Sequence, residues 1–174
     1  TFSFHSECLK EFEEQKLFTA LSRFANVTEI RSPLIKFFYN CSKENSDALF
    51  RDQAIINALI SATTTNCEER LISLVILMKL SMDKECAATI VNSSVFTTAN
   101  LKNMFVQATS KTSQENKILL KLIRNIADNQ PSLIEGFDEE IVKACINNAR
   151  NMDALCDIFA ISSRIKMKSA RAMA

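Results

Sequence analysis

The apolar positions of this chain follow one helical pattern that occurs four times. In each occurrence, a stretch of eight residues is mostly apolar at positions one, two, four, five and eight. This spacing of i, i+1, i+3, i+4 and i+7 predicts a broad apolar face on one side of an α-helix. The four octets are LIKFFYNC (34–41), SLVILMKL (73–80), LLKLIRNI (119–126) and LCDIFAIS (155–162).

The octets recur roughly every 40 residues, which is typical of helical repeat proteins whose units bury their apolar faces against their neighbours. We therefore predict an all-α fold, a right-handed α-solenoid of about four three-helix repeats. The expected units are roughly 1–45, 46–82, 83–129 and 130–174 of one continuous helical domain. The side chains expected to be nearly fully buried in its middle are Leu77, Leu80, Leu122 and Ile126.

Polar residues at the expected helix starts support this division. Ser32 followed by Pro33 resembles a cap and a first helical residue, and Asn66 and Thr112 each precede a glutamate by three residues, as in a capping box. The single glycine, Gly136, is expected to close a short helix. Asp83 and Asp138 are also predicted caps, and helices are expected to start at Asp52 or Gln53, at Thr97 or Thr98, at Pro131, and at Asn151 or Asp153.

Composition narrows the class of protein. One glycine and two prolines are too few for the many tight turns of a β-sandwich or barrel. A net charge of +1 lacks the basic footprint of a nucleic-acid binder, and no apolar run approaches the ~20 residues of a membrane span. The chain begins at Thr1 without Met, so we expect a fragment of a longer protein.

The six cysteines are scattered and form no C-x-x-C pair, which favours reduced thiols and a cytoplasmic location over a disulfide framework. We expect most of them to be buried, with Cys41 and Cys156 facing the core from their octets. The six residues are Cys8, Cys41, Cys67, Cys86, Cys145 and Cys156.

The sequence offers no set of residues for catalysis, a cofactor or a metal. His5 is the sole histidine, so neither a zinc site of about four ligands nor a cysteine–histidine pair is indicated. A phosphate-binding loop needs glycines that the chain lacks. The paired carboxylates lie in expected first helical turns, where negative charge favours the helix dipole. We expect a protein that is not an enzyme and binds no cofactor.

Each expected unit consists of a short, a medium and a long helix, and the long helix carries IRNIA (123–127) or FYNCS (38–42) near its end. In these respects the chain resembles the armadillo (ARM/HEAT-like) family. Segments 74–87 and 119–137 are also similar to the armadillo region of the kinesin-associated adaptor family. The chain departs from the family in the turn between first and second helices, where only the Gly136 turn contains the usual glycine.

This resemblance implies that the long helices line a concave face that binds a partner. In the family, asparagines at the seventh octet position hold the backbone of an extended peptide; Asn40 and Asn125 match that position, whereas Lys79 and Ile161 do not. Octet positions three, six and seven point away from the core, and in three units they carry no acid. The expected partner-binding residues are Lys36, Tyr39, Asn40, Met78, Lys79, Lys121, Arg124 and Asn125.

Two functions follow from these expectations. In the first, the chain is a cytoplasmic scaffold or adaptor that binds a protein segment with acidic residues, and neither nucleic acid nor membrane. In the second, it is a structural spacer or self-associating module, such as a homodimer, within a large cytoskeletal, centriolar or ciliary assembly. An exposed apolar patch larger than a monomer tolerates would favour the second function.

Overall fold

The computed structural model describes residues 11, 14, 16–24, 27–43, 53–64 and 69–172, apart from the side chains of 19, 28, 64 and 166–172. Every regular element in these residues is a helix, which confirms the all-α class. The elements are α2 (Leu17–Ser22), α3 (Thr28–Lys43), α4 (Gln53–Thr64), α5 (Arg70–Leu80), α6 (Lys84–Val91), α7 (Thr98–Ser110), α8 (Gln114–Asn129), the 3-10 helix η2 (Pro131–Ile134), α9 (Asp138–Asn147) and α10 (Met152–Ala172).

The chain forms two compact units, Thr1–Ser93 and Ser94–Ala174. In the first unit, α4 packs against α2, α5 and α6, and α5 also packs against α3. Three phenylalanine rings join α2 to α3, because the ring centroid of Phe18 lies 5.8 Å from that of Phe37 and 6.5 Å from that of Phe38. The core side chains of this unit are fully buried and include Ile35, Phe38, Ile55, Ile56, Leu59, Ile76 and Leu77.

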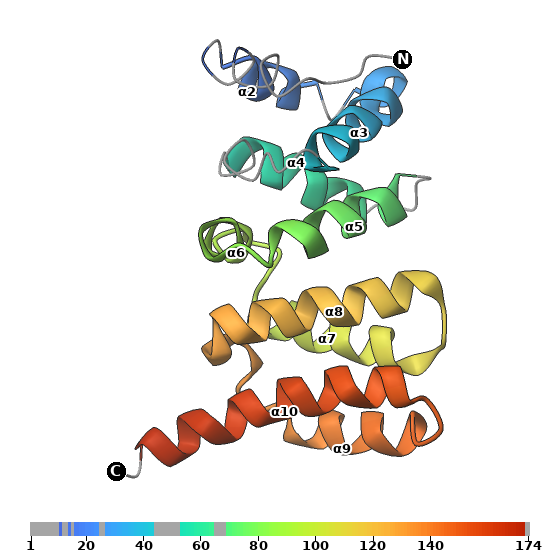
Figure 1. The fold of residues 1–174 in the computed structure, drawn as a ribbon, viewed down its shortest axis with the longest axis vertical. Helices are drawn as coiled ribbons and strands as arrows, with labels where there is room; N and C mark the ends of the chain where they lie inside the picture. The colour runs from blue at the N-terminus through green and yellow to red at the C-terminus, as the bar shows by residue number, and fades with distance from the viewer. Residues whose placement is uncertain are drawn as a thin grey trace. The chain divides into compact units, whose positions relative to one another are not determined.

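The second unit consists of two helical hairpins, α7–α8 and α9–α10, with η2 between them in the chain (Figure 1). The hairpins pack helix on helix, α8 against α10 and α7 against α9. The rings of Phe105 on α7 and Phe137 before α9 lie 5.8 Å apart and are both fully buried. Each hairpin thereby covers the apolar side of the other.

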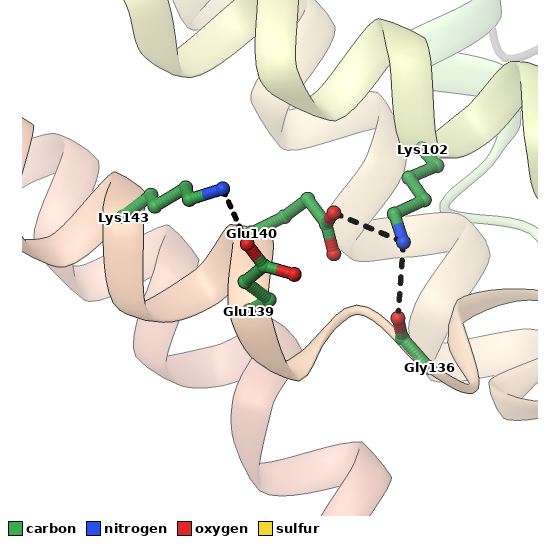
Figure 2. Close-up of polar contacts among 5 residues, drawn as sticks. All are labelled: Lys102, Gly136, Glu139, Glu140 and Lys143. Atoms are coloured by element: carbon green, nitrogen blue, oxygen red, sulfur yellow. Dashed lines mark hydrogen bonds and ion pairs between the residues drawn. The ribbon is translucent and has the colours of Figure 1, made fainter.

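Polar contacts also join the hairpins of the second unit. Lys102 of α7 reaches the turn before α9, where its ammonium lies 2.9 Å from the Glu140 carboxylate and donates to the Gly136 carbonyl at 3.4 Å (Figure 2). At the other end, the Asn148 amide donates to the Thr109 carbonyl at 2.9 Å. Since each contact uses a group at a helix end, the contacts fix the connecting turns as well as the helices.

The core positions of the first three octets are confirmed. Leu77, Leu80, Leu122 and Ile126 are fully buried as expected. In the 34–41, 73–80 and 119–126 octets, each residue at positions one, two, four, five and eight is buried, apart from the half-buried Phe37. The five-position apolar pattern therefore correctly predicts which side chains of these three octets face the core.

The prediction for the fourth octet was wrong. Cys156 and Phe159 were expected to face the core but are exposed, whereas Asp157 and Ile161 were expected to point outward and are buried. The buried face of α10 is formed by Asp157, Ile158 and Ile161. The helix is therefore rotated about its axis relative to the orientation that the octet pattern predicted. The aspartate is accommodated because Arg124 of α8 donates a hydrogen bond of 2.7 Å to it.

Three of the predicted helix starts are confirmed by cap geometry. The Asp83 carboxylate accepts from the backbone N–H groups of Glu85 and Cys86, at 3.0 and 2.9 Å. The Thr97 hydroxyl accepts from Asn100 at 3.3 Å, and the Asn151 side chain accepts from Ala154 at 3.3 Å. The short helix that opens at Pro131 is also present, and Gly136 after it has a left-handed backbone with φ of 81°.

Three other starts were misplaced. Helix α3 begins at Thr28, because the Val27 carbonyl already accepts from Ile30 and Arg31, so Ser32 is no cap and Pro33 lies inside the helix. The cap of α8 is Ser113, one residue after Thr112. Asp138 was expected to cap α9 but is its first helical residue, and Phe137 occupies the cap position. The Asn66 cap lies outside the described residues.

Candidate functional site

The expected binding residues of the first unit lie on the surfaces of α3 and α5. Lys36 and Asn40 are exposed, whereas Tyr39, Met78 and Lys79 are half-buried. The ammonium group of Lys43, one turn further along α3, lies 4.4 Å from the centroid of the Tyr39 ring. This cation–π contact occupies one face of the aromatic ring that was expected to meet a partner.

In the second unit, Lys121 is exposed, and Arg124 and Asn125 are half-buried. The Arg124 guanidinium already has a partner within the chain, because its Nη1 lies 2.7 Å from Oδ1 of Asp157. Lys121 therefore differs from Arg124: it forms no ion pair with any residue that the structure describes. Of these two cationic side chains on α8, Arg124 therefore stabilises the packing of α10, whereas Lys121 faces solvent.

A groove of about 320 Å³ runs along this side of α8. Its walls come from four parts of the second unit: the end of α7 with the turn after it, α8, the turn before α10, and the first two turns of α10. The residues are Ala108, Lys111, Thr112, Asn116, Lys117, Leu120, Lys121, Asn148, Asn151, Asp153, Ala154, Cys156 and Asp157.

Two asparagine amides hold the turns at the end of the groove. Asn116 is buried, and its Nδ2 donates to the carbonyls of Gln107 and Lys111 at 3.1 and 2.8 Å. Asn148 donates to the carbonyls of Thr109 and Ala144 at 2.9 and 3.0 Å. Because these bonds satisfy carbonyls at the ends of α7 and α9, the groove has a preformed wall.

The charges in the groove favour an anionic ligand. Lys111, Lys117 and Lys121 are exposed, and none forms an ion pair within the described part of the chain. Of the two acids, Asp157 is held by Arg124 and has a side chain only 10% exposed, so Asp153 is the one acid left facing solvent. Because three exposed lysines outnumber the single solvent-facing acid, the electrostatic potential of the groove is positive.

The groove presents groups that can bind a charged ligand. Cys156 is the one thiol in its lining, and no histidine lies among the described residues. Within residues whose positions are described, no group of three His, Cys, Asp or Glu side chains could hold a metal ion. The lysine ammonium groups can bind carboxylates.

Sequence reasoning missed Lys111 and Lys117. Lys117 lies one turn before Lys121 and shares its face of α8, but the octet that defined the helix begins at Leu119. Extending the pattern by one turn would have found it. Lys111 lies in the α7–α8 turn, and only the packing of the two hairpins places it in the groove.

The expected set of eight residues is therefore divided between two units, and the structure brings only one member of the set, Lys121, into the groove.

Cys41 and Cys86 are buried as expected, Cys145 is half-buried, and no disulfide joins the four described cysteines. His5, Cys8 and Cys67 lie outside the described residues. In the described chain, no helix has the length and apolar character needed to cross a membrane.

No protein-family model, curated protein or solved structure matches the chain.

Proposed function

We propose that this chain is a non-enzymatic protein-interaction scaffold of the armadillo type, which binds a partner segment rich in acidic residues. The observation that supports it most strongly is the α8–α10 groove, with Lys111, Lys117 and Lys121 on its walls. A segment bound there places its carboxylates near the lysine ammonium groups, which can donate hydrogen bonds to them. Such charges raise the encounter rate and select against basic partners.

The repeat character of the proposal is supported by regular spacing in the second unit. The polar contacts between its hairpins join residues 33 to 39 positions apart in sequence. This interval lies just below the period of about 40–47 residues of armadillo and HEAT units. Within the first unit, the surfaces of α3 and α5 that carry Lys36, Asn40 and Lys79 are a separate proposed contact surface, and the proposed scaffold acts in the cytoplasm.

The proposal can be tested with fluorescently labelled peptides of equal length that are acidic, neutral or basic. We expect the acidic peptide to bind most tightly and to weaken as salt is added, because exposed ion pairs are screened. The variant Lys117→Gln/Lys121→Gln should bind it several-fold more weakly, since each exposed pair contributes roughly 0.2–1 kcal/mol.

The matched control is Arg23→Gln/Lys84→Gln, which removes two exposed positive charges from the first unit. It should bind the acidic peptide as the unaltered chain does. Arg124 is left unchanged in both variants because it stabilises the α8–α10 contact. Equal binding of the acidic and neutral peptides, or equal loss in both double variants, would show that the groove lysines do not select the partner.

The alternative, a self-associating structural module, is favoured by a different feature. Large apolar side chains are exposed on both helices of the last hairpin: Val142 and Ile146 on α9, and Met152 and Phe159 on α10.

A further inference from the structure

Two ion pairs join α8 to α10 in the same order along both helices. Arg124 of α8 donates to Asp157 of α10, and further along, Arg164 of α10 donates to Asp128 of α8. Because the residue numbers rise together from the first pair to the second, α8 and α10 run in the same direction (Figure 1). The turn of α8 that precedes Arg124 therefore lies across from the turn of α10 that precedes Asp157.

These two preceding turns carry a base and an acid that are not joined. Lys121 lies three residues before Arg124 on α8, and Asp153 lies four residues before Asp157 on α10. Both side chains line the groove and are exposed. Neither forms an ion pair or a side-chain hydrogen bond with any residue in the described part of the chain. We call Lys121 and Asp153 the open pair of the groove.

The two members of the open pair lie in different surroundings. Lys121 has a second lysine, Lys117, one turn away on the same wall of the groove. Asp153 lies on the α10 wall and also lines an adjoining opening of about 570 Å³. Arg150 lines that opening but forms no ion pair with Asp153 among the described residues. One wall of the groove therefore presents positive charge, and the other presents one unpaired carboxylate.

We propose that the groove selects a partner segment in which an acidic residue is accompanied by a lysine or an arginine. The acid of the segment contacts Lys121, and its basic residue contacts Asp153. This inference rests on the proposed function of the groove and adds Asp153 to it as a specificity-determining residue. A purely acidic segment would bring like charge to Asp153, whereas a segment with both charges is complementary to both walls.

The open pair reverses the preference that three lysines alone would produce. A groove that acts only through its positive potential binds the ligand with the greatest negative charge most tightly. A groove that uses Asp153 as well prefers the ligand with one added basic residue, although the net negative charge of that ligand is smaller. The two modes of recognition can therefore be separated by peptides that differ at a single position.

The test uses labelled peptides that share an acidic block and differ at one neighbouring position, which is arginine, glutamine or glutamate. One set carries this position before the block and a second set carries it after, since a segment can lie in the groove in either direction. In one of the two sets, fluorescence anisotropy should show the arginine peptide binding about threefold more tightly than the glutamine peptide. The glutamate peptide should bind most weakly.

Two variants examine the role of Asp153. Asp153→Asn should remove the preference, so that the arginine and glutamine peptides bind equally. Asp153→Lys should reverse the order and make the glutamate peptide the tightest ligand. The matched control is Asp138→Asn, which removes an exposed first-turn acid from α9, outside the groove lining, and should keep the preference. Circular dichroism on heating would establish that each variant is folded.

The outcomes separate this inference from the function on which it rests. An arginine peptide that gains nothing over the glutamine peptide in both sets overturns the role of Asp153, as does a preference that survives Asp153→Asn. In either case, an acidic block that still binds more tightly than a neutral block leaves the proposed function standing. An acidic block that binds no more tightly than a neutral one overturns both.

Discussion

Arg124 on α8 and Asp157 on α10, which are 33 positions apart in the chain, form a hydrogen-bonded ion pair of 2.7 Å between the two helices. The Asp157 side chain is only 10% exposed, so its carboxylate depends on the guanidinium for stabilisation. The pair explains why an acid can lie on the inward face of α10. It also means that Arg124 acts first as a structural residue.

Removing the arginine should therefore destabilise the second unit. We expect Arg124→Met to lower the free energy of unfolding by about 1–3 kcal/mol, because a nearly buried carboxylate loses its partner. The neighbouring Lys121→Met is the matched control and should change it by less than about 0.5 kcal/mol, since Lys121 is exposed. Urea denaturation of the three proteins measures both values, and equal losses would contradict the structural role of Arg124.

The ion pair of Lys102 and Glu140 should make stability depend on acid pH. The hydrogen bond from Lys102 lowers the pKa of Glu140 below its ordinary value. The unfolded chain then binds a proton more readily than the folded one, so the pair stabilises above the unfolded pKa and this contribution is lost as pH falls through the folded pKa.

The test of this relation is Lys102→Met. Its loss of stability relative to the unaltered chain should be largest near neutral pH and should shrink at acid pH, as measured by denaturation at several pH values. Lys143→Met is the control: its partner Glu139 is 73% exposed, so the variant should differ little from the unaltered chain at any of these pH values. A Lys102→Met loss that is independent of pH would contradict the assigned role of Glu140.

The confirmed core positions predict large effects of truncation. Leu77→Ala in the first unit and Leu122→Ala in the second should each cost about 2–5 kcal/mol of unfolding free energy, because both side chains are fully buried. Leu71 on α5 is 38% exposed, and Leu71→Ala should cost much less. Chemical denaturation would report these differences, and a loss below about 1 kcal/mol at Leu77 would be inconsistent with the core described above.

The described cysteines should differ sharply in reactivity. Burial raises the pKa of Cys41 to about 12, so its thiol stays protonated and inaccessible at neutral pH. Cys156 is exposed on α10 and should react rapidly with a chromogenic disulfide at low protein concentration. Replacing Cys156 by Ser should remove one fast-reacting thiol, whereas Cys41→Ser should remove none. The reverse result would show that α10 is rotated relative to the position described.

Much of the fold could be predicted from the sequence because its signals are local. The apolar faces of α3, α5 and α8 follow from residues within three turns of each other, and the Asp83 and Thr97 caps bind groups two or three residues away. The largest error has a long-range cause. The inward face of α10 includes Asp157, whose partner Arg124 lies in another helix.

The candidate site was only partly predictable for the same reason. Lys121 was identified because it lies in an octet, but its neighbours in the groove come from separate turns that approach each other only when the hairpins pack. Local periodicity indicates which residues of one helix face outward. It does not indicate which outward residues of two helices share a cavity.

The spacing of the hairpin contacts has a consequence for how the second unit folds. Lys102 with Glu140, Thr109 with Asn148, and Asp128 with Arg164 all join residues of adjacent hairpins. Each of these contacts joins one hairpin to its neighbour, so a folded hairpin offers the polar partners that the other one needs. Folding can therefore start in one hairpin and propagate to the other.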